Sequence, residues 1–391
     1  MNIIYIGAFR LPYYDAAAAR VLNNARIFQL CNNVVSFISW GGKYDKKHLC
    51  DDGKYRIDSM EYIVTEELDP QGTLFKKAIL LLNRGKKSIA ILKKMECKPD
   101  VIILYNAHHS WTKRMIEFCN IHHIKLVNDI TEWYDNHDLH FWDIFSYHIN
   151  MTKTQHLIKN KIVISSYLNK YYKESNNLQL PPLCDGHEKK WNAIVQDDCI
   201  KPFNGITLIY AGNPAKKDCV HTVINAVNTL ANENLHIRFL ILGITKDNYI
   251  KNYRKVLMSD ILHENIIFLG RVSQELIPAY YKKADFMVLL RKPSRKNMAG
   301  FPTKCAEAIT AGVPVITNAT SDLEQYIRNG KNGFIVPGYE YHDILSLLRD
   351  TILSLPPETI CKLKIQTKGM RDVFDYRTHV KKVEYFLNNL Q

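Results

Sequence analysis

The 391-residue sequence has no run of 18 or more apolar residues, the length that a membrane-spanning helix requires. It also has no C-x-x-C pair, no H-E-x-x-H motif and no G-x-x-x-x-G-K-[ST] loop. These absences argue against a membrane-spanning protein, a cysteine-rich zinc site, a zinc protease and a P-loop nucleotide-binding protein. The nine cysteines are scattered and odd in number, which favours reduced thiols in a reducing compartment.

The composition is that of a folded protein, with 46% apolar and 23% charged residues. A chain of 391 residues is long enough for two domains. Its first residues, MNIIYIGAFRLPYYD, have no basic segment before the apolar stretch, so we expect the first core strand of a cytoplasmic protein there. The net charge of +13 favours polyanionic partners: nucleic acid, anionic lipid or phosphorylated substrates.

The segment Phe75–Lys98 combines basic and apolar residues in a pattern typical of an amphipathic helix. Its basic residues are Lys76, Lys77, Arg84, Lys86, Lys87, Lys93, Lys94 and Lys98. We expect a helix over Phe75–Glu96 whose basic face binds an anionic membrane surface. The alternative is an ordinary helix whose apolar side faces its own core, and for the apolar side this alternative is favoured.

Short apolar runs alternate with helical stretches, which predicts parallel βαβ units and an α/β fold. The strands expected in the first half are Ile3–Gly7, Val34–Trp40, Val101–Tyr105, Lys125–Asp129 and Lys161–Ser165. Those expected in the second half are Thr207–Ala211, Arg238–Leu242, Ile266–Leu269, Phe286–Leu290, Val313–Thr317 and Gly333–Val336. Helices are expected between them, among others at Ala16–Cys31, Trp111–Ile121, Val220–Asn232, Pro278–Lys283 and Thr303–Thr310.

The polar stretch Glu174–Asn204 has weak periodicity and contains two adjacent prolines, so we interpret it as a linker and crossover. We expect a first doubly wound domain at residues 1–190, a linker at 191–204 and a second doubly wound domain at 205–372. A C-terminal helix at 373–391 is expected to return to the first domain. Two such domains that face one another leave a cleft at the carboxyl ends of both sheets, where open α/β folds bind ligands.

The most informative motif is Ala299–Ile316, AGFPTKCAEAITAGVPVI. It predicts a tight turn, a helix that begins at Thr303, a glycine stop and a buried strand. A helix N-terminus has unpaired N–H groups and a positive partial charge, which suit a phosphate. Glu307 lies one helical turn further in and is placed to accept hydrogen bonds from a ribose diol. The alternative is the turn-helix-strand unit of any α/β protein with a surface glutamate.

Basic residues follow several expected strands of the second half. Lys216 and Lys217 lie in the turn Tyr210–Asp218, Arg271 lies just after the strand expected at Ile266–Leu269, and Arg291 ends another strand. The carboxyl ends of parallel strands share one edge of a sheet, so these loops and the helix at Thr303 are expected to converge. Together they indicate a nucleotide-diphosphate site.

These motifs closely resemble those of the retaining glycosyltransferases of family 4, which have the GT-B fold. The matching segments are Ala211–Asp218, Gly270–Val272, Ala299–Asn318 and Ile327–Pro337. In the first half, Ile6–Leu30 and Phe37–Gly42 are similar to a subgroup that builds bacterial surface polysaccharides. The resemblance implies two Rossmann-like domains that face one another across a cleft, the first binding the acceptor and the second binding the nucleotide-sugar donor.

The resemblance also implies roles for single residues. Glu307 matches the second glutamate of the family's E-x7-E motif, which holds the donor ribose, and Lys217 matches the lysine that neutralises the departing diphosphate, with Lys216 as the alternative. The backbone at Thr303 and Lys304 would face the diphosphate. The donor-binding set implied is Gly212, Asn213, Lys216, Gly300, Phe301, Pro302, Thr303, Lys304 and Glu307. Gly7 and the helix that carries Arg20 would line the cleft on the acceptor side.

Two positions depart from the family pattern. The first glutamate of the E-x7-E motif is replaced by Ala299, and the arginine expected after the glycine of the lysine turn is replaced by Asn213. The second change removes one of two cations that stabilise the leaving group. Arg291 and Arg271 are the candidate substitutes, since each ends a neighbouring strand, and loss of one such cation typically costs a few kcal/mol of transition-state stabilisation.

The function expected is transfer of a sugar, with retention, from a nucleotide diphosphate sugar to a saccharide acceptor that is lipid-linked. The partners expected are this donor, this acceptor and an anionic surface on the inner face of the membrane, and no cofactor or metal is implied. Asp129, Glu132 and His108 are the acceptor-side candidates for acid/base chemistry, with helix capping as the alternative for the two carboxylates. Two other functions stay open: a nucleotide-sugar epimerase of the same fold, and a non-catalytic protein that binds polyanions.

Overall fold

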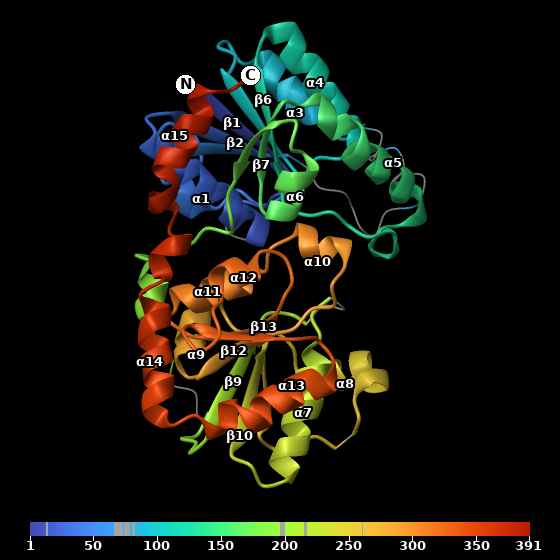
Figure 1. The fold of residues 1–391 in the computed structure, drawn as a ribbon. Coiled ribbons are helices and arrows are strands. Elements are labelled where there is room, and N and C mark those ends of the chain that lie inside the picture. The colour runs from blue at the N-terminus through green and yellow to red at the C-terminus, as the bar shows by residue number, and fades with distance from the viewer. Residues whose placement is uncertain are drawn as a thin grey trace. The chain divides into compact units, whose positions relative to one another are not determined.

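The computed structural model describes residues 1–12, 15–65, 73, 79, 83–195, 200–214, 217–259 and 261–391. They form two compact units, shown in Figure 1. The first unit contains Met1–Leu183 and Tyr376–Gln391, and the second contains Cys184–Asp375. The domain limits expected from sequence, 190, 204 and 372, stay a prediction.

The first unit is built on an eight-stranded sheet with the order β3-β4-β2-β1-β5-β6-β7-β8. Its strands are β1 (Asn2–Gly7), β2 (Val34–Trp40), β3 (Arg56–Ile57), β4 (Met60–Thr65), β5 (Val101–Tyr105), β6 (Lys125–Ile130), β7 (Asn160–Val163) and β8 (Asn176–Gln179). All neighbours are parallel except the short edge pair β3 and β4. The helices are α1 (Ala16–Leu30), α3 (Lys86–Lys94), α4 (His109–His122), α5 (Phe141–Thr152), α6 (Ser166–Tyr171) and α15 (Val380–Asn388).

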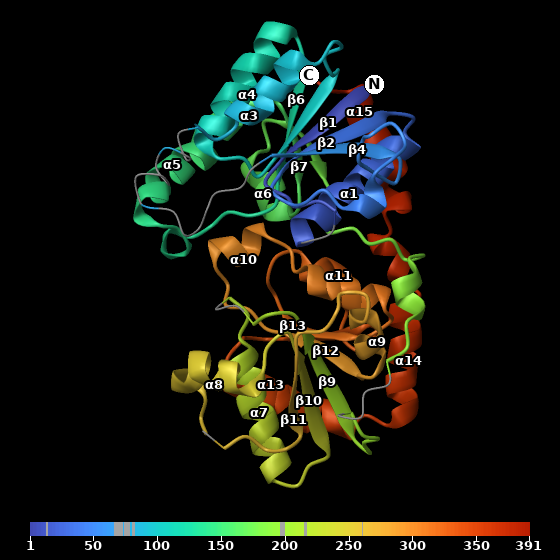
Figure 2. The same cartoon turned by 180° about the vertical axis from the view of Figure 1, so that it is seen from behind.

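Helices cover both faces of this sheet, because β1 is apolar on both sides. Ile3 and Tyr5 join a core with α1 and α15, whereas Ile4 and Ile6 join a second core with α3 and α4. Figure 1 shows α1 beside α15 and, across the sheet, α3 beside α4; Figure 2 shows the same pairs from behind. The expected return of the C-terminal helix to the first domain is confirmed, since Val383 of α15 is fully buried in that first core.

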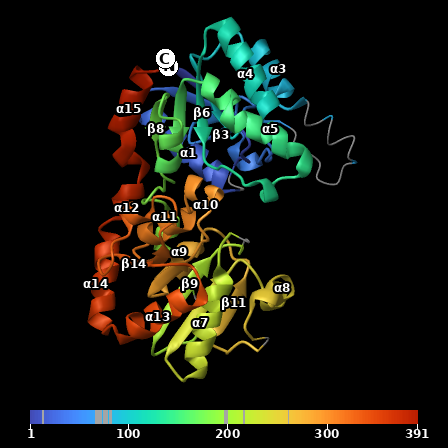
Figure 3. The same ribbon diagram turned by 45° about the vertical axis from the view of Figure 1, so that its right-hand side comes forward.

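The second unit contains a six-stranded parallel sheet with the order β11-β10-β9-β12-β13-β14. The strands are β9 (Ile206–Ala211), β10 (Ile237–Leu242), β11 (Ile266–Gly270), β12 (Phe286–Leu289), β13 (Val315–Asn318) and β14 (Gly333–Val336). The helices are α7 (Val220–Asn232), α8 (Lys246–Tyr253), α9 (Ile277–Lys282), α10 (Arg295–Ala299), α11 (Thr303–Thr310), α12 (Leu323–Tyr326), α13 (Tyr341–Asp350) and α14 (Pro357–Lys368). This is the doubly wound order whose direction reverses between β9 and β12, where such folds bind ligands. Helix α11 packs against α9 and α14, and α13 packs against α7 (Figure 3).

Every strand expected from the sequence overlaps an observed strand. The interpretation of Glu174–Asn204 as linker and crossover was wrong at its start, because Asn176–Gln179 is β8 and pairs with β7. This strand lacks apolar alternation. Asparagine side chains hold it instead: Asn176 donates to Asn160 at 3.1 Å, and Asn177 donates to the carbonyl of Tyr172 at 2.7 Å.

The continuous helix expected over Phe75–Glu96 was also wrong. Residues 75–78 and 80–82 lie outside the described part of the chain, and α3 begins only after Gly85, whose φ is +84°. A Cβ atom on Gly85 would lie 2.2 Å from Cδ1 of Trp111, so the chain must turn closely over that ring. The apolar side of α3 faces its own core through the fully buried Leu92.

Candidate functional site

The candidate site lies in the second unit, at the carboxyl ends of β9 and β12. Gly212 follows β9, Arg291 follows β12, and Asp218 pairs with Arg291 in an isolated β-bridge. The site therefore occupies the point where the strand order reverses, the place at which open parallel sheets bind ligands.

Asp218 is the centre of a buried cluster of charged side chains. Its carboxylate accepts hydrogen bonds from Nε of Arg291 at 2.7 Å, from Nζ of Lys304 at 3.1 Å and from the hydroxyl of Tyr210 at 2.6 Å. Burial alone would raise the pKa of Asp218, but Arg291 and Lys304 hold it well below its usual range. The carboxylate is therefore ionised, and one negative charge opposes two positive charges.

The two cations of the cluster differ in accessibility. The Arg291 side chain is 6% exposed and the Lys304 side chain is 19% exposed. Arg291 is also fixed through its backbone, since its N–H donates to Asn318 at 2.8 Å and its carbonyl accepts from Asn318 at 2.8 Å. Arg291 is thus held as part of the scaffold, and Lys304 is the cation of the pair that a ligand can reach.

Helix α11 begins beside this cluster. Pro302 precedes it without a side-chain cap, and the backbone N–H groups of Thr303 and Lys304 find no acceptor among the described residues. The turn before the helix is anchored by Phe301, whose ring packs 5.4 Å from that of Tyr326, centroid to centroid. Unpaired N–H groups and the helix dipole make this end a site for an anion.

Gly212 allows the lysine to approach the turn after β9. Its φ is +129°, and a Cβ atom there would lie 2.5 Å from Cε of Lys304. The ammonium group of Lys304 also lies 5.2 Å from the centroid of the Tyr210 ring, a cation–π distance. Any side chain at residue 212 would displace Lys304 from the N-terminus of α11.

Glu307 lies one turn into α11 and is half-buried. Burial raises the pKa of its carboxyl, and the charges of Lys190 and Lys304 counteract part of that rise. Lys190 belongs to a short 3-10 helix at Lys189–Asn192. The structure thus brings Thr303, Lys304 and Glu307 together with Gly212 and Arg291, as the sequence motifs led us to expect.

Other donor-side candidates lie in the same turns or further away. Lys217 is half-buried beside Asp218, Asn213 is exposed, and Lys216 lies outside the described residues. Gly300 is half-buried at the end of α10 and Pro302 is buried. Arg271 is exposed after β11, the edge strand furthest from β12 on that side of the sheet. The structure does not bring Arg271 to the Asp218 cluster.

Three acceptor-side candidates lie together inside the first unit. Arg20 and Asp129 form an ion pair of 2.8 Å and are 5% and 0% exposed. The Asp129 carboxylate also accepts from the hydroxyl of Tyr5 and from Asn24. Gly7 packs against Tyr105, whose carbonyl oxygen lies 2.4 Å from where a Cβ would be. This arrangement favours a structural role for Arg20 and Asp129, by a buried ion pair rather than by helix capping.

The remaining acceptor-side candidates lie after β5 and β6. His108 is the residue before α4, and its burial together with the charge of Arg84 lowers its pKa to about 3. The imidazole is therefore neutral at ordinary pH. Glu132 is half-buried and its carboxylate accepts from the hydroxyl of Tyr134, whose pKa is raised by burial and by this carboxylate.

A potential metal-ligand group among the described residues is Asp135, His137 and Asp138, whose ligand atoms lie within 4.8 Å of one another. His137 and Asp138 are exposed, and the group contains none of the candidate site residues. An exposed acidic group of this kind is common without an ion, so it supports no metal site.

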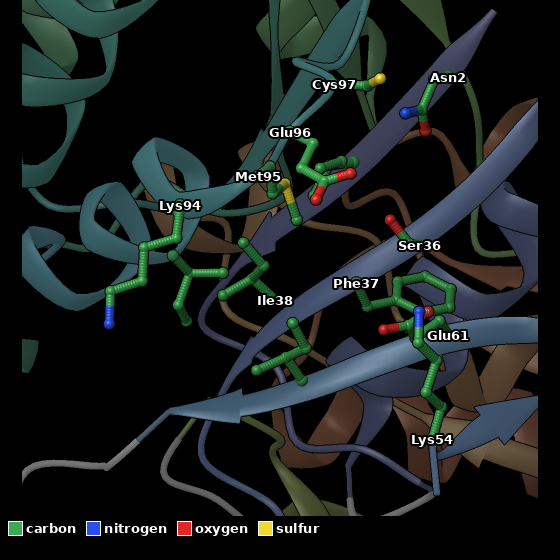
Figure 4. Close-up of a pocket in the computed structure, with 13 residues that line it drawn as sticks. Asn2, Ser36, Phe37, Ile38, Lys54, Glu61, Lys94, Met95, Glu96 and Cys97 are labelled. Atoms are coloured by element: carbon green, nitrogen blue, oxygen red, sulfur yellow. Dashed lines mark hydrogen bonds and ion pairs between the residues drawn. The ribbon is translucent and has the colours of Figure 1, made fainter. Parts of the chain in front are cut away.

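A cavity of about 490 Å³ lies in the first unit, near the amino ends of its strands (Figure 4). Its wall is mixed: Ile38 and Met95 are among the apolar lining residues, and Lys54 and Glu61, which form an ion pair of 2.8 Å, are among the charged ones. None of the candidate site residues lines it. The cavity is thus separate from the carboxyl ends of the strands, where ligands of such sheets bind.

Residues 200–359 match the family model described as Glycosyl transferases group 1. The matched segment contains the whole Asp218 cluster and Glu307. Spore coat protein SA of Bacillus subtilis is 25% identical over 137 residues, which are 34% of this chain and 35% of that protein. The putative colanic acid biosynthesis glycosyltransferase WcaL of Salmonella typhimurium is 25% identical over 137 residues, 35% of this chain and 33% of that protein. The matches thus span about a third of these relatives.

Solved structures resemble the chain over its full length. Sucrose-phosphate synthase from Thermosynechococcus elongatus has a TM-score of 0.71 at 13% identity and covers 100% of this chain and 98% of its own. The Anabaena protein HepE, in complex with UDP and glucose, has a TM-score of 0.69 at 14% identity and covers 100% of both chains. The fold is GT-B. At these identities the likeness establishes the GT-B fold and nothing about the reaction.

Sequence reasoning missed two features of the GT-B chain's second unit. Asp218 was seen only as part of the lysine turn, and the side chain of Lys304 was given no role. The available signal for Asp218 was its position next to Lys217, in a basic turn at the edge of a sheet. A carboxylate that is buried at such a position requires a cationic partner. Its partners lie 73 and 86 residues away, so the sequence does not identify them.

Proposed function

We propose that the chain is a glycosyltransferase of the retaining, family 4 type that moves a hexosyl group from a nucleotide diphosphate sugar to a saccharide. The observation that supports this most is the Asp218 cluster at the N-terminus of α11, with Glu307 one turn further in. It offers cationic and N–H groups for a diphosphate and a carboxylate for a ribose diol. The family match over residues 200–359 agrees with this assignment.

In the proposed reaction the bond between the anomeric carbon and the diphosphate oxygen breaks, and a bond to an acceptor hydroxyl oxygen forms on the same face. The hydroxyl proton passes to the departing diphosphate, so no further reactant is needed. Lys304, Lys217 and the N-terminus of α11 stabilise the negative charge that develops on the leaving group. Lys304 takes the place of the cationic arginine that the family has at the position of Asn213. The other two candidates are less suitable, because Arg291 is neutralised by Asp218 and Arg271 is distant.

The acceptor is proposed to be a lipid-linked saccharide in the synthesis of a cell-surface polysaccharide. The support for this is the relative described as a putative colanic acid biosynthesis glycosyltransferase and the basic helix α3, whose Lys86, Lys87, Lys93 and Lys94 are all exposed. Among the described helices, none is both long and apolar enough to cross a membrane. Peripheral attachment at the inner face of a membrane, through the lysines of α3, is part of the proposal.

The two other functions have less support. An epimerase requires an accessible acid/base pair, but Asp129 is 0% exposed and held by Arg20, and His108 is neutral with a pKa of about 3 because of burial and Arg84. A polyanion-binding protein would have no use for the buried Asp218 carboxylate beside the helix N-terminus. The transferase is the function that uses the whole cluster.

Nucleotide binding is the first test of the donor site. A nucleotide diphosphate at a hundred times its dissociation constant should add about 2.7 kcal/mol to the stability of the second unit, which corresponds to a rise in Tm of roughly 5 to 10 °C. The measurement is thermal unfolding with a panel of nucleotide diphosphates and their sugars. We expect one base to stabilise the protein and Glu307→Ala to lose most of that shift.

Glu264→Ala is the matched control, since Glu264 is an exposed glutamate of the same unit, and it should keep the full shift. If no nucleotide changes Tm, the proposed transferase is wrong. If Glu307→Ala keeps the whole shift, the donor site stands but Glu307 does not hold the ribose.

Membrane attachment has a separate test. Each lysine near an anionic surface contributes about 1 kcal/mol, so Lys93→Gln with Lys94→Gln should weaken binding to vesicles that contain anionic lipid by roughly 30-fold. Binding should also fall as salt rises, because salt screens exposed charges. The double variant Lys46→Gln with Lys47→Gln removes two exposed lysines of the same unit and should bind normally. Sedimentation that is indifferent to salt and lipid charge would contradict attachment through α3.

A further inference from the structure

Arg84 is a buried arginine, and two of its three guanidinium nitrogens have no hydrogen-bond partner among the described residues. The residue is 9% exposed, and its Nε and Nη1 atoms are buried without an acceptor among the residues that the structure describes. Burial lowers its pKa only to about 10, so the group is charged at ordinary pH. A buried cation that lacks hydrogen bonds is costly, and such a group usually has a partner.

A second buried donor without an acceptor lies next to Arg84. Nε1 of Trp111 has no hydrogen-bond partner in the described part of the chain, and the residue is 2% exposed. The ring of Trp111 lies against Gly85, the neighbour of Arg84, where a Cβ atom would approach Cδ1 to 2.2 Å. Two neighbouring residues thus present three buried nitrogen donors that no acceptor in the described part of the chain satisfies.

The surroundings of Arg84 favour a negative charge. Helix α4 begins at His109 without a side-chain cap, and its N-terminus carries a positive partial charge. The Arg84 guanidinium lies near this N-terminus, because its charge lowers the pKa of His108, the residue before the helix. Asp143 acts on Arg84 through its charge, but it makes no hydrogen bond to Nε or Nη1 of the arginine. The carboxylates of the described residues therefore leave these two nitrogens unsatisfied.

Arg84 is held in place without the help of its own side-chain donors. Its carbonyl accepts from Nη1 of Arg114 on α4 at 2.8 Å, and its guanidinium carbon lies 5.4 Å from the centroid of the Trp40 ring. Trp40 in turn packs edge-to-face on Trp111 at 6.0 Å. The guanidinium is therefore positioned by its backbone and by aromatic rings, which leaves its N–H groups for a ligand.

The position of these residues in the fold is that of a ligand site. Trp40 is the last residue of β2, and His108 follows β5 at the start of α4. These two strands flank β1, so the group lies at the carboxyl edge of the first sheet, where its strand order reverses. Ligands of open α/β sheets bind at this edge.

We propose that Arg84 and Trp111, at the N-terminus of α4, bind an oxyanion group carried by the acceptor, a phosphate or a carboxylate. An oxyanion accepts several hydrogen bonds at once, and a guanidinium binds it through two parallel N–H groups. A neutral sugar hydroxyl would leave the arginine charge uncompensated. The proposal rests on the proposed transferase function, because it identifies the class of acceptor for that reaction.

The test is calorimetric binding of three probes to the full chain: glucose 1-phosphate, glucuronate and neutral glucose. Each titration is repeated with a saturating nucleotide diphosphate, which occupies the donor site. We expect one or both anions to bind, glucose not to bind, and Arg84→Met to raise the dissociation constant roughly 10- to 100-fold. If only glucose 1-phosphate binds, the oxyanion of the acceptor is a phosphate. If only glucuronate binds, it is a carboxylate.

The stability of the unliganded variant separates a binding role from a structural one. Because Nε and Nη1 of Arg84 have no acceptor among the described residues, Arg84→Met should leave Tm unchanged or higher without anion, as is common when a residue kept for binding is replaced. Arg84→Lys, which keeps the charge but loses the two parallel N–H groups, should bind the anion with intermediate affinity. Arg56→Met is the control, because it removes one positive charge from an ion pair with Asp52 at the surface of the same unit.

Anion binding that is equal in the normal chain and in Arg84→Met would overturn this site, and so would a large loss of Tm in Arg84→Met without anion. The titrations with a nucleotide diphosphate distinguish the oxyanion site from the proposed transferase function. If nucleotides bind and the anions do not, only the oxyanion site is wrong. If the anions bind through Arg84 and no nucleotide does, the transferase proposal is wrong and the anion site remains.

Discussion

Replacing Lys304 by methionine is expected to lower the rate constant of sugar transfer by about 10²- to 10³-fold, the usual effect of removing one group that stabilises developing negative charge. The fold should survive this change, because Asp218 keeps its bonds to Arg291 at 2.7 Å and to Tyr210 at 2.6 Å. The measurement is steady-state kinetics with the donor identified by the nucleotide panel, together with thermal unfolding of the same samples.

Lys362→Met is the control, since it removes an exposed lysine from α14 of the same unit and should change neither rate nor stability. The way in which kcat and KM change also matters. A loss confined to kcat places Lys304 in the transition state, whereas a higher KM with normal kcat means that it binds donor and transition state equally. A variant with normal kinetics would show that another cation replaces the arginine missing at Asn213.

Replacing Asp129 by alanine is expected to destabilise the first unit by about 3 to 5 kcal/mol, because the change leaves Arg20 buried without its partner. Arg20 is 5% exposed, and the carboxylate it loses also accepts from Tyr5 and Asn24. Chemical denaturation followed by tryptophan fluorescence measures the effect. Asp51→Ala, an exposed aspartate of the same unit, should leave the unfolding midpoint unchanged.

A double variant distinguishes a structural ion pair from a catalytic base. Arg20→Met with Asp129→Leu removes both charges at once, and it should recover much of the stability that Asp129→Ala loses, since apolar pairs often replace buried ion pairs without loss. If Asp129 were a base in the reaction, Asp129→Ala would instead abolish transfer in a chain of normal stability. That result would return Asp129 to the active site.

Most of the strands were predictable because they are buried on both faces, but β3, β4 and β8 were not among the strands expected from the sequence. A run such as Ile206–Ala211, with all six residues buried, is apolar without alternation, as expected of a parallel sheet covered by helices. β8 was missed for the opposite reason. The side-chain amides of Asn176 and Asn177 donate hydrogen bonds to Asn160 and to the carbonyl of Tyr172. A polar segment that is held in a sheet by such bonds has no apolar pattern from which the strand could be predicted.

The start of α3 after Gly85 could not be predicted from the sequence either. Lysines and apolar residues continue on both sides of it with helical spacing, and glycine inside a helical pattern costs only about 1 kcal/mol relative to alanine. Helix α3 begins only after the left-handed backbone of Gly85, where a Cβ atom would lie 2.2 Å from the Trp111 ring. That contact joins two segments that are 26 residues apart in the printed sequence.

The α/β class, the parallel sheets and the helix start at Thr303, with Glu307 one turn further in, could be read from the sequence, because they depend on apolar runs and on spacing within a few residues. Which charges meet depends on the folded chain. Asp218 contacts Arg291 and Lys304 across 73 and 86 residues, and Arg20 contacts Asp129 across 109. A charge is accepted in a protein interior only with a partner, and the fold, rather than any local pattern, selects that partner.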